Sequence, residues 1–471
     1  MNEAPGGVMP LFIDSAYLVA AALFILGLKR LSSPRTARNG NMLGALGMLI
    51  AVVVTLLHWE IVGFVWIAVG IVLGSGVGLY LAQTVPMTAM PQMVALLNGF
   101  GGGASALVAG DEYLRYAAGQ IAPAYDVQAT IMLSVLIGGI TFSGSLIAFG
   151  KLQGLVSERT VMLPGQRIWA GPFFAATLGL AAWLVAVDAN MPWYIALNAV
   201  ALVLGLLFVM PIGGADMPVV ISLLNSYSGL AAAMTGFVLS NNVLIISGAL
   251  VGASGLILTQ IMCQAMNRSL ANVLFGAFTA KALQTGGATA VAGKSVSSVQ
   301  AQDAAIMLGY ARAVIFVPGY GLAVSQAQHQ VRELAELLEA RGVDVKYAIH
   351  PVAGRMPGHM NVLLAEANVP YPQLWEMDRI NGEFERTDVA VVIGANDVVN
   401  PAARHDRNSP IYGMPILDVD KAKSVIVMKR SMNPGFAGIE NELFYNENTR
   451  MLFGDARKSL VAVIQELKAG V

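Results

Sequence analysis

The fold is decided by one stretch, Arg312-Ala313-Val314-Ile315-Phe316-Val317-Pro318-Gly319-Tyr320-Gly321-Leu322-Ala323-Val324. Its apolar start, 312–317, predicts a buried strand; a tight turn over 319–324 and a helix over 325–341 follow. Gly319 permits the turn and Gly321 lets the backbone approach a pyrophosphate, whereas Val324 replaces the usual third glycine. In this context the pattern favours a dinucleotide site.

Outward from this stretch, the pattern of an α/β domain continues to the C-terminus. Further strands are predicted at 343–349, 389–393, 416–419, 424–428 and 451–453, with a short leading helix over 299–309 and a closing helix over 456–468. Six strands joined by crossovers predict one doubly wound, Rossmann-like parallel sheet, which we assign to a domain over residues 308–471.

The absence of an acidic residue at the end of the second predicted strand indicates which dinucleotide the site binds. An NAD site usually has an acidic residue at the end of the second strand, but that strand here ends Tyr347-Ala348-Ile349-His350. Lys429, Arg430 and Ser431 follow a later strand and offer two cations and a hydroxyl for a 2′-phosphate. The sequence therefore favours NADP(H), with a solvated charged loop as the alternative for Lys429 and Arg430.

Two further loops follow strands at the same edge of the predicted sheet. Residues 351–359 form a Gly/Pro-rich loop suited to covering phosphates, and Gly394-Ala395-Asn396-Asp397 follows the strand at 389–393. Asp397 either caps a turn or, as we prefer, titrates with the redox state of a neighbouring cofactor. His350 and His359 are interpreted as polar loop residues, and no metal site is predicted, because no Cys or acidic cluster accompanies them.

The rest of the chain has a different composition. The 471 residues are only 12% charged and have a mean hydropathy of +0.64, which excludes a wholly soluble or a disordered protein. Residues 1–265 hold only 17 of the 57 charged residues. The net charge of −1 gives no reason to expect nucleic acid as a partner, and the single cysteine, Cys263, excludes an intrachain disulfide.

Nine apolar stretches, each long enough to cross a bilayer, predict a polytopic helical membrane domain over residues 1–265. They lie at 11–28, 41–57, 61–84, 90–110, 128–149, 168–187, 193–212, 217–237 and 243–265. The first has no Lys or Arg before it, so we expect it to be retained rather than cleaved. Residues 266–307 contain few large apolar side chains and are interpreted as a linker.

The positive charges beside the spans predict their orientation. The loops on one side hold Lys29, Arg30, Arg35, Arg38, Lys151, Arg159, Arg167 and Arg268, and those on the other hold only Arg115. Because positive residues stay in the cytoplasm, we expect the N-terminus outside and the C-terminal domain in the cytoplasm.

Two spans carry an internal repeat, M-P-x-x-x-x-L-L-N-x-x-x-G-x-A-x-A. Residues 90–106 and 217–233 share it, which places Asn98 and Asn225 at similar depth. These amides, with Ser254, either hold helices together or line a path for a proton. Asp216 precedes the eighth span and is either the carboxylate nearest to that path or only a charge at a helix N-terminus. No predicted span contains a histidine.

The nucleotide domain leaves no room for a substrate domain of its own. A complete dehydrogenase needs an acid or base beside its substrate, so we expect the hydride to be exchanged with another protein. Joined to a polar-lined bundle, this indicates redox chemistry coupled to ion movement. The alternative is a channel or transporter gated by a nucleotide-sensing domain without chemistry, although no selectivity-filter sequence such as TVGYG is present.

Several motifs together resemble the β subunits of proton-translocating NAD(P) transhydrogenases over essentially the full chain. In the C-terminal part they are GYGLAVSQAQH (319–329), VAGRMPGHMNVLLAE (352–366), GANDVVNP (394–401), KRS (429–431) and LFGDA (452–456); in the membrane part they are GGADMP (213–218) and NSYSG (225–229).

The resemblance implies a membrane domain followed by an NADP(H)-binding domain. It also implies an α subunit that holds NAD(H) and adds membrane helices, a dimer of such heteromers, and a place in the bacterial inner membrane. The implied reaction is hydride transfer from NADH to NADP⁺, in the Si-specific class, coupled to inward proton movement. The proton-carrying histidine is then expected on the partner, because this chain has Asn98 where some members have a histidine.

The family's nucleotide contacts carry over residue by residue. The resemblance implies contacts by Tyr320, Val352, Ala353, Gly354, Arg355, Met356, Pro357, Gly394, Ala395, Asn396, Asp397, Val398, Gly413, Met414, Lys429, Arg430, Ser431, Met432, Asn433, Pro434, Gly435, Phe436, Asp455 and Ala456. Asp397 matches the family's acid beside the nicotinamide. Phe436 stands where a tyrosine is common, so a hydroxyl contact is lost, and Tyr412 stands where a small residue is usual.

Overall fold

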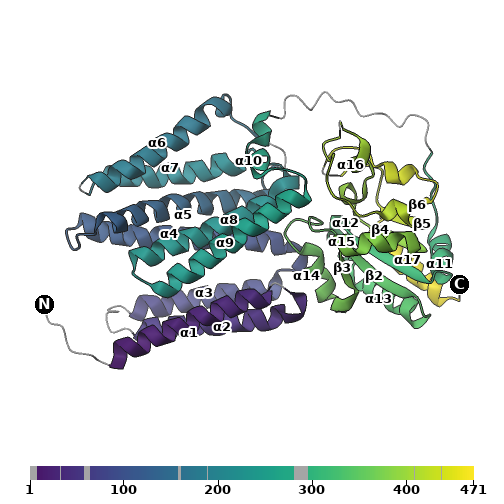
Figure 1. The fold of residues 1–471 in the computed structure, drawn as a ribbon, viewed down its shortest axis with the longest axis horizontal. Coiled ribbons are helices and arrows are strands. Elements are labelled where there is room, and N and C mark those ends of the chain that lie inside the picture. The colour runs from purple at the N-terminus through teal and green to yellow at the C-terminus, as the bar shows by residue number, and fades with distance from the viewer. Residues whose placement is uncertain are drawn as a thin grey trace.

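A computed structural model describes residues 8–31, 33–57, 64–157, 161–187, 189–279, 295–407, 409–435 and 437–470. It consists of a helical bundle and an α/β domain that lies against one end of the bundle (Figure 1). The predicted fold class, a polytopic helical membrane part followed by a doubly wound parallel sheet, is confirmed.

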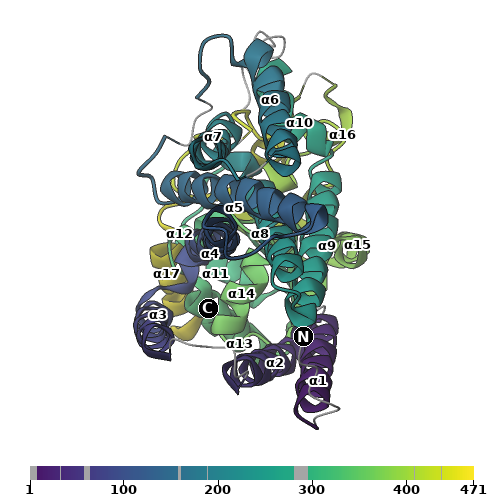
Figure 2. The ribbon, with the colours of Figure 1, turned by 90° about the vertical axis from the view of Figure 1, so that its left-hand side faces the viewer.

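Nine helices of the described chain are long and apolar enough to cross a membrane. They are α1 (Val8–Leu31), α2 (Pro34–Leu57), α3 (Phe64–Thr84), α4 (Met90–Ala117), α5 (Tyr125–Leu152), α6 (Gln166–Ala186), α7 (Met191–Val209), α8 (Met217–Val238) and α9 (Asn242–Ala265). Seen end-on, α4, α5, α8 and α9 form the middle of the bundle, with α6 and α7 on one side and α1 to α3 on the other (Figure 2).

Glycines bring the central helices close together. A Cβ on Gly102 of α4 would lie 2.9 Å from the Gly138 carbonyl oxygen of α5, and a Cβ on Gly229 of α8 would lie 2.8 Å from the Gly248 oxygen of α9. Only a residue without a side chain allows these backbones to approach so closely, as is common where helices associate in lipid.

The sequence repeat has a structural counterpart. Helix α4 follows the 3₁₀ turn η1 (Met87–Ala89) and α8 follows the 3₁₀ turn η2 (Gly214–Asp216), and each helix begins Met-Pro. Proline suits the first helical turn because its missing N–H would have no partner there. Both helices therefore start with the same local geometry.

The α/β domain is built on a six-stranded parallel sheet in the order β3-β2-β1-β4-β5-β6. The strands are β1 (Ala313–Pro318), β2 (Asp344–Ile349), β3 (Leu374–Glu376), β4 (Val389–Ile393), β5 (Ser424–Lys429) and β6 (Thr449–Phe453). The order reverses between β1 and β4. Ligands of such sheets bind beyond the carboxyl ends of the strands at this reversal.

Helices cover both faces of the sheet, and the two central strands, β1 and β4, are apolar along their whole length. Along β1, Val314 and Phe316 face a core shared with α11 (Ala301–Gly309), α13 (Gln328–Ala340), α14 (His359–Glu366) and α17 (Ala456–Lys468). Ile315 and Val317 face the opposite core, which includes Phe384 of the 3₁₀ segment η5 (Asn381–Arg386).

Two strand predictions need correction. Residues 416–419 are not a strand, because their backbone bonds elsewhere: Asn381 Nδ2 donates to the Ile416 oxygen and Leu417 N donates to the Val398 oxygen. They lead into the 3₁₀ turn η7 (Val419–Lys421). The sixth strand is β3 instead, whose three residues were too few to produce a recognisable period.

Two helix predictions also change. The tight turn expected at 319–324 is mostly a short helix, α12 (Tyr320–Val324), and α13 begins only at Gln328 because Gln326 adopts φ 49° between them. The expected linker contains a helix, α10 (Leu270–Thr279), while residues 280–294 of that linker lie outside the described residues. The predicted leading and closing helices are α11 and α17.

Candidate functional site

A pocket of about 710 Å³ lies at the carboxyl edge of the sheet, where the strand order reverses. Twenty-one of the predicted cofactor residues line it: Gly319, Tyr320, Gly321, Val324, Val352, Ala353, Gly354, Gly394, Ala395, Asn396, Asp397, Val398, Met414, Lys429, Arg430, Ser431, Asn433, Pro434, Gly435, Asp455 and Ala456. Residues from loops far apart in the sequence therefore share one cavity.

The floor of the pocket is the junction of the turns after β1 and β4. Gly319 N donates to the Ile393 oxygen and Gly321 N to the Gly394 oxygen, both at 2.9 Å. A Cβ on Gly321 would lie 2.7 Å from Gly394 Cα, so the two turns touch through glycine alone. Glycine is therefore required at 321 partly because the two turns pack directly on each other.

Asn396 and Asp397 form one wall beside the turn at Gly435. Ala437 N donates to Asp397 Oδ2 at 3.0 Å, and Asn441 Nδ2 donates to Asn396 Oδ1 at 3.0 Å. Asn396 Nδ2 is buried without a hydrogen-bond partner in the described structure. A buried amide donor left open on a pocket wall suits a polar ligand group.

The two cations predicted for a 2′-phosphate stand at the end of β5. Lys429 is half-buried and its ammonium donates to the Asn433 carbonyl, whereas Arg430 is exposed. Burial lowers the pKa of Lys429, and the Asp397 carboxylate opposes that shift. Lys429 is therefore a partly desolvated cation, whose charge a ligand anion would stabilise.

Five predicted cofactor residues do not line the pocket: Arg355, Met356, Pro357, Gly413 and Met432. Arg355 extends towards the bundle, where its Nη1 donates to the Leu152 oxygen at the end of α5 at 3.0 Å, and its guanidinium lies 4.4 Å from the Tyr320 ring centre. Phe436 lies outside the described residues.

Sequence reasoning missed several lining residues, and two of them come from the membrane side. Met266 and Arg268, just beyond α9, close the pocket against the bundle. Arg268 Nη1 lies 2.9 Å from both carboxylate oxygens of Asp216. Nothing local in the sequence predicts this, because the contact depends on how the two domains meet. The other missed lining residues are Ser325, Pro410, Ile411, Met428, Ala437 and Gly454.

The candidate proton-path residues lie in different surroundings. Asn98 is buried and its Nδ2 donates to the Ile221 oxygen of α8 at 3.3 Å. This interhelical contact is the one expected if Asn98 holds helices together. Asn225 and Ser254 are half-buried, and Ser254 Oγ donates to the Val251 oxygen of its own helix. Burial raises the pKa of Asp216 and Arg268 opposes the shift. Asp216 is thus an ion-pair partner, which its sequence context did not indicate.

Of the two histidines interpreted as polar loop residues, His350 directly follows β2, whereas His359 is the first residue of helix α14; both are buried. Burial lowers the pKa of both His350 and His359 to about 4. As a neutral ring, His350 accepts from Val352 N at Nδ1 and donates from Nε2 to the Pro415 oxygen at 2.9 Å. The described residues hold no group of three or more His, Cys, Asp or Glu side chains suited to a metal ion.

Comparison with known proteins identifies the family. The family model for the NAD(P) transhydrogenase beta subunit matches residues 13–466. Two sequences named NAD(P) transhydrogenase subunit beta, one from Rhodospirillum rubrum and one from a named strain of it, are each 51% identical over 457 residues. The match covers 96% of this chain and 98% of each relative. The chain therefore belongs to the NAD(P) transhydrogenase beta subunit family.

Proposed function

We propose that this chain is the NADP(H)-binding, membrane-spanning subunit of a proton-translocating transhydrogenase. In this proposal a partner subunit holds NAD(H), and hydride passes from NADH to NADP⁺ bound here while a proton moves inward. The observation that carries the proposal is the pocket at the strand reversal, which has nucleotide-binding turns on one side and membrane-domain residues on the other.

The pocket residues suit NADP(H). The Gly319–Gly321 turn, which has no bulky side chain at either glycine, would lie against the pyrophosphate. Lys429, Arg430 and Ser431 would bind the 2′-phosphate, and the Asn396–Asp397 wall would face the nicotinamide end. The nicotinamide, when bound, supplies the carbon that accepts or gives hydride. The protein groups bind and orient it, and the half-buried Lys429 balances anionic charge inside the pocket.

The surface of the bundle supports a partner with membrane helices. Helix α3 has a high mean hydropathy of 2.1 but no buried residue, and on α4 the side chains of Leu97, Phe100 and Leu107 are exposed. Glycines at 74, 76 and 78 have no atom near a would-be Cβ, so α3 presents small residues to whatever lies beside it. Small-residue faces suit close packing by another helix. We propose that α-subunit helices pack here, in a dimer of heteromers.

The proposed location is the bacterial inner membrane, with the N-terminus outside and the NADP(H) domain in the cytoplasm, as the positive charges predict. A proton path along α4, α8 and α9 would pass Asn98, Asn225 and Ser254 towards Asp216, beside the pocket. One charge crossing 100 mV releases about 2.3 kcal/mol, and about 1.4 kcal/mol is tenfold in an equilibrium constant, so one proton suffices to shift the NADPH/NADP⁺ ratio well over tenfold.

The test is hydride transfer by the complex of this chain and its α subunit in liposomes. NADP⁺ should be reduced at the expense of NADH, and faster when a proton gradient is imposed; a protonophore, which collapses that gradient, is the control. Bound NADP(H) without hydride transfer would overturn the proposal in favour of a nucleotide-gated channel or transporter. NADH deuterated on the Si face of C4 tests the Si-specific assignment. The assignment predicts that the deuterium reaches NADP⁺, and deuterium retained in NAD⁺ would contradict it.

A further inference from the structure

One further segment contributes to the lining of the pocket: residues 402–407 and 409–417, which we call the 402–417 loop. Its described residues Pro410, Ile411 and Met414 line the pocket. On its other side the Tyr412 oxygen accepts a hydrogen bond of 2.9 Å from Asn267 Nδ2, next to α9, while the Tyr412 side chain is exposed. The loop therefore touches both the pocket and the membrane domain.

The loop packs as a unit. Ala403, Ile411, Met414 and Ile416 form a small apolar cluster of their own, and Gly413 N donates to the Ala403 oxygen at 2.8 Å. These contacts fix the shape of the loop. Its position over the pocket depends on contacts with other segments: Ala437 and Ile439 pack against the cluster, and the Pro415 oxygen accepts a hydrogen bond from His350 Nε2. The two ends of the loop are attached separately.

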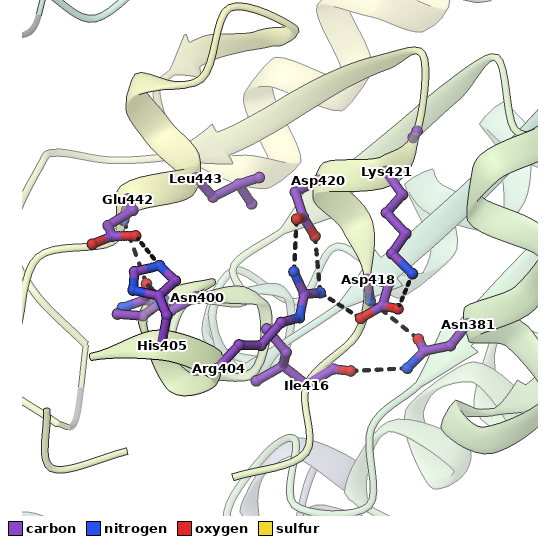
Figure 3. Close-up of polar contacts among 12 residues, drawn as sticks. Asn381, Asn400, Arg404, His405, Ile416, Asp418, Asp420, Lys421, Glu442 and Leu443 are labelled. Carbon is purple, nitrogen blue, oxygen red and sulfur yellow. Dashed lines mark hydrogen bonds and ion pairs between the residues drawn. The ribbon is translucent and has the colours of Figure 1, made fainter. Parts of the chain in front are cut away.

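The end of the loop is attached to η5 by Asn381. Asn381 Nδ2 donates to the Ile416 oxygen at 3.0 Å, and Asp418 N donates to Asn381 Oδ1 at 3.1 Å. Figure 3 shows this pair of bonds beside the ion pairs of Arg404.

The start of the loop is attached by Arg404, on the short helix α16 (Ala402–His405). Its guanidinium makes a bidentate ion pair with Asp420, in which Nη1 donates to Oδ2 at 2.7 Å and Nη2 donates to Oδ1 at 3.0 Å. Nη2 also donates to Asp418 (Figure 3). Both acids flank or belong to η7, which leads into β5. Residues 14 and 16 positions apart are thereby joined across the base of the loop.

This ion pair differs from an ordinary surface pair. Exposed single pairs contribute little, but a bidentate guanidinium within a network of charges is the favourable exception. The side chains are only 36%, 19% and 21% exposed for Arg404, Asp418 and Asp420. Asp418 precedes the 3₁₀ turn η7 and Asp420 belongs to it, so the backbone that carries both acids is structured.

We propose that Arg404 is a positioning residue of the nucleotide site. The ion pairs of its guanidinium with Asp418 and Asp420, which we call the Arg404 staple, keep the 402–417 loop closed and so hold Ile411 and Met414 against the pocket. Arg404 does not line the pocket, so it acts through the loop. The inference rests on the proposed function, because it assumes that the pocket binds NADP(H). Apparent affinity falls with the fraction of molecules in the binding-competent state, so a loop that opens more often weakens NADPH binding.

The test compares variants in the complete complex with the α subunit. Arg404→Gln should raise the dissociation constant for NADPH about fivefold, equivalent to about 1 kcal/mol, and Arg404→Lys should restore part of the loss because it keeps the charge but not the fork. The KM for NADH, bound by the partner, should not change. Lys421→Gln is the control: it removes a cation bound to Asp418 at 3.0 Å without touching the 402–417 loop.

The outcomes are separable. Wild-type NADPH affinity in Arg404→Gln, or an equal loss in Lys421→Gln, overturns the staple while leaving the proposed function intact. A wild-type complex that binds no NADPH overturns both. If Arg404→Gln does not assemble, Asp420→Asn tests the same contact from the other side: the staple predicts the same fivefold loss, and an unchanged dissociation constant contradicts it.

Discussion

Replacing Lys429 and Arg430 together by alanine tests what the pocket binds. The two cations end β5 at the pocket, where Lys429 is half-buried and lies 5.6 Å from the Phe444 ring centre, and Arg430 is exposed. If they hold a 2′-phosphate, their removal should weaken NADPH binding and leave the interactions of the rest of the nucleotide in place.

The size of the loss follows from their burial. A hydrogen bond from the half-buried Lys429 to a charged phosphate contributes about 2 kcal/mol, and one from the exposed Arg430 contributes about 1 kcal/mol. Together they give about 3 kcal/mol, which is roughly a 150-fold rise in the dissociation constant. Lys429→Ala alone should account for most of it, about 30-fold.

The assay displaces NADPH from the complex with adenosine 2′,5′-bisphosphate or adenosine 5′-monophosphate, which differ only in the 2′-phosphate. The double variant should lose affinity for the first compound and not for the second. Lys423→Ala is the matched control, because Lys423 stands at the opposite end of β5 and pairs with Asp388 at 2.8 Å. Equal losses for both compounds, or none for either, would refute the 2′-phosphate assignment.

Three further predictions concern stability and the pocket floor. Gly321→Ala should destabilise the protein by about 1–3 kcal/mol and weaken NADPH binding, because the new Cβ would lie 2.7 Å from Gly394 Cα. Gly382→Ala is the control, because no atom lies within 4 Å of its Cβ position. Equal melting temperatures of the two variants would contradict the packing argument. The pKa of about 4 for buried His350 and His359 lies below the unfolded value of 6.5, so the unfolded chain binds more protons and stability falls as pH drops from about 6.5 towards 4. At pH 5 the loss reaches up to about 2 kcal/mol for each histidine, and His350→Gln should flatten the melting temperature against pH. Arg268→Gln should lower the melting temperature more than Arg268→Gln with Asp216→Asn, because the single change leaves a carboxylate only 14% exposed without its cation; the reverse order would show that the pair does not stabilise the fold.

Most of the fold could be predicted because its signals are local. Nine long apolar stretches and five of the six strands follow from period and length alone, and the closing helix α17 has the predicted bounds. The failures are short or irregular. Three residues cannot establish a period, so β3 was missed. The apolar Ile416 and Leu417 have the pattern of a strand, but their backbone groups bond to Asn381 and Val398 instead of to a neighbouring strand.

The pocket could be predicted as far as the sheet dictates it. Parallel strands end at one edge, so the loops after β1, β2, β4 and β5 were expected to converge, and the family resemblance added Asp455 and Ala456 after β6; residues of all five loops line one cavity. The contributions of Met266 and Arg268 depend on contact between two domains, for which no spacing rule exists. Arg355 shows the same limit, since its bond to the Leu152 oxygen is visible only once α5 is beside the loop.

Those domain contacts give the proposed coupling a short physical route. Arg268 lines the pocket and pairs with the Asp216 carboxylate at the start of α8. In the proposed coupling, a change of charge in the pocket would act on the same ion pair that a proton reaching Asp216 would break. Linkage is reciprocal: if protonation of Asp216 changes the affinity of the pocket for one redox state, binding of that state changes the proton affinity of Asp216 by the same factor. With one shared arginine between the two events, no long chain of moving residues is required. Under the proposed function, the amides of α4 and α8 would need only to deliver the proton to the pocket's edge, where its binding energy would be converted into a preference between NADP⁺ and NADPH.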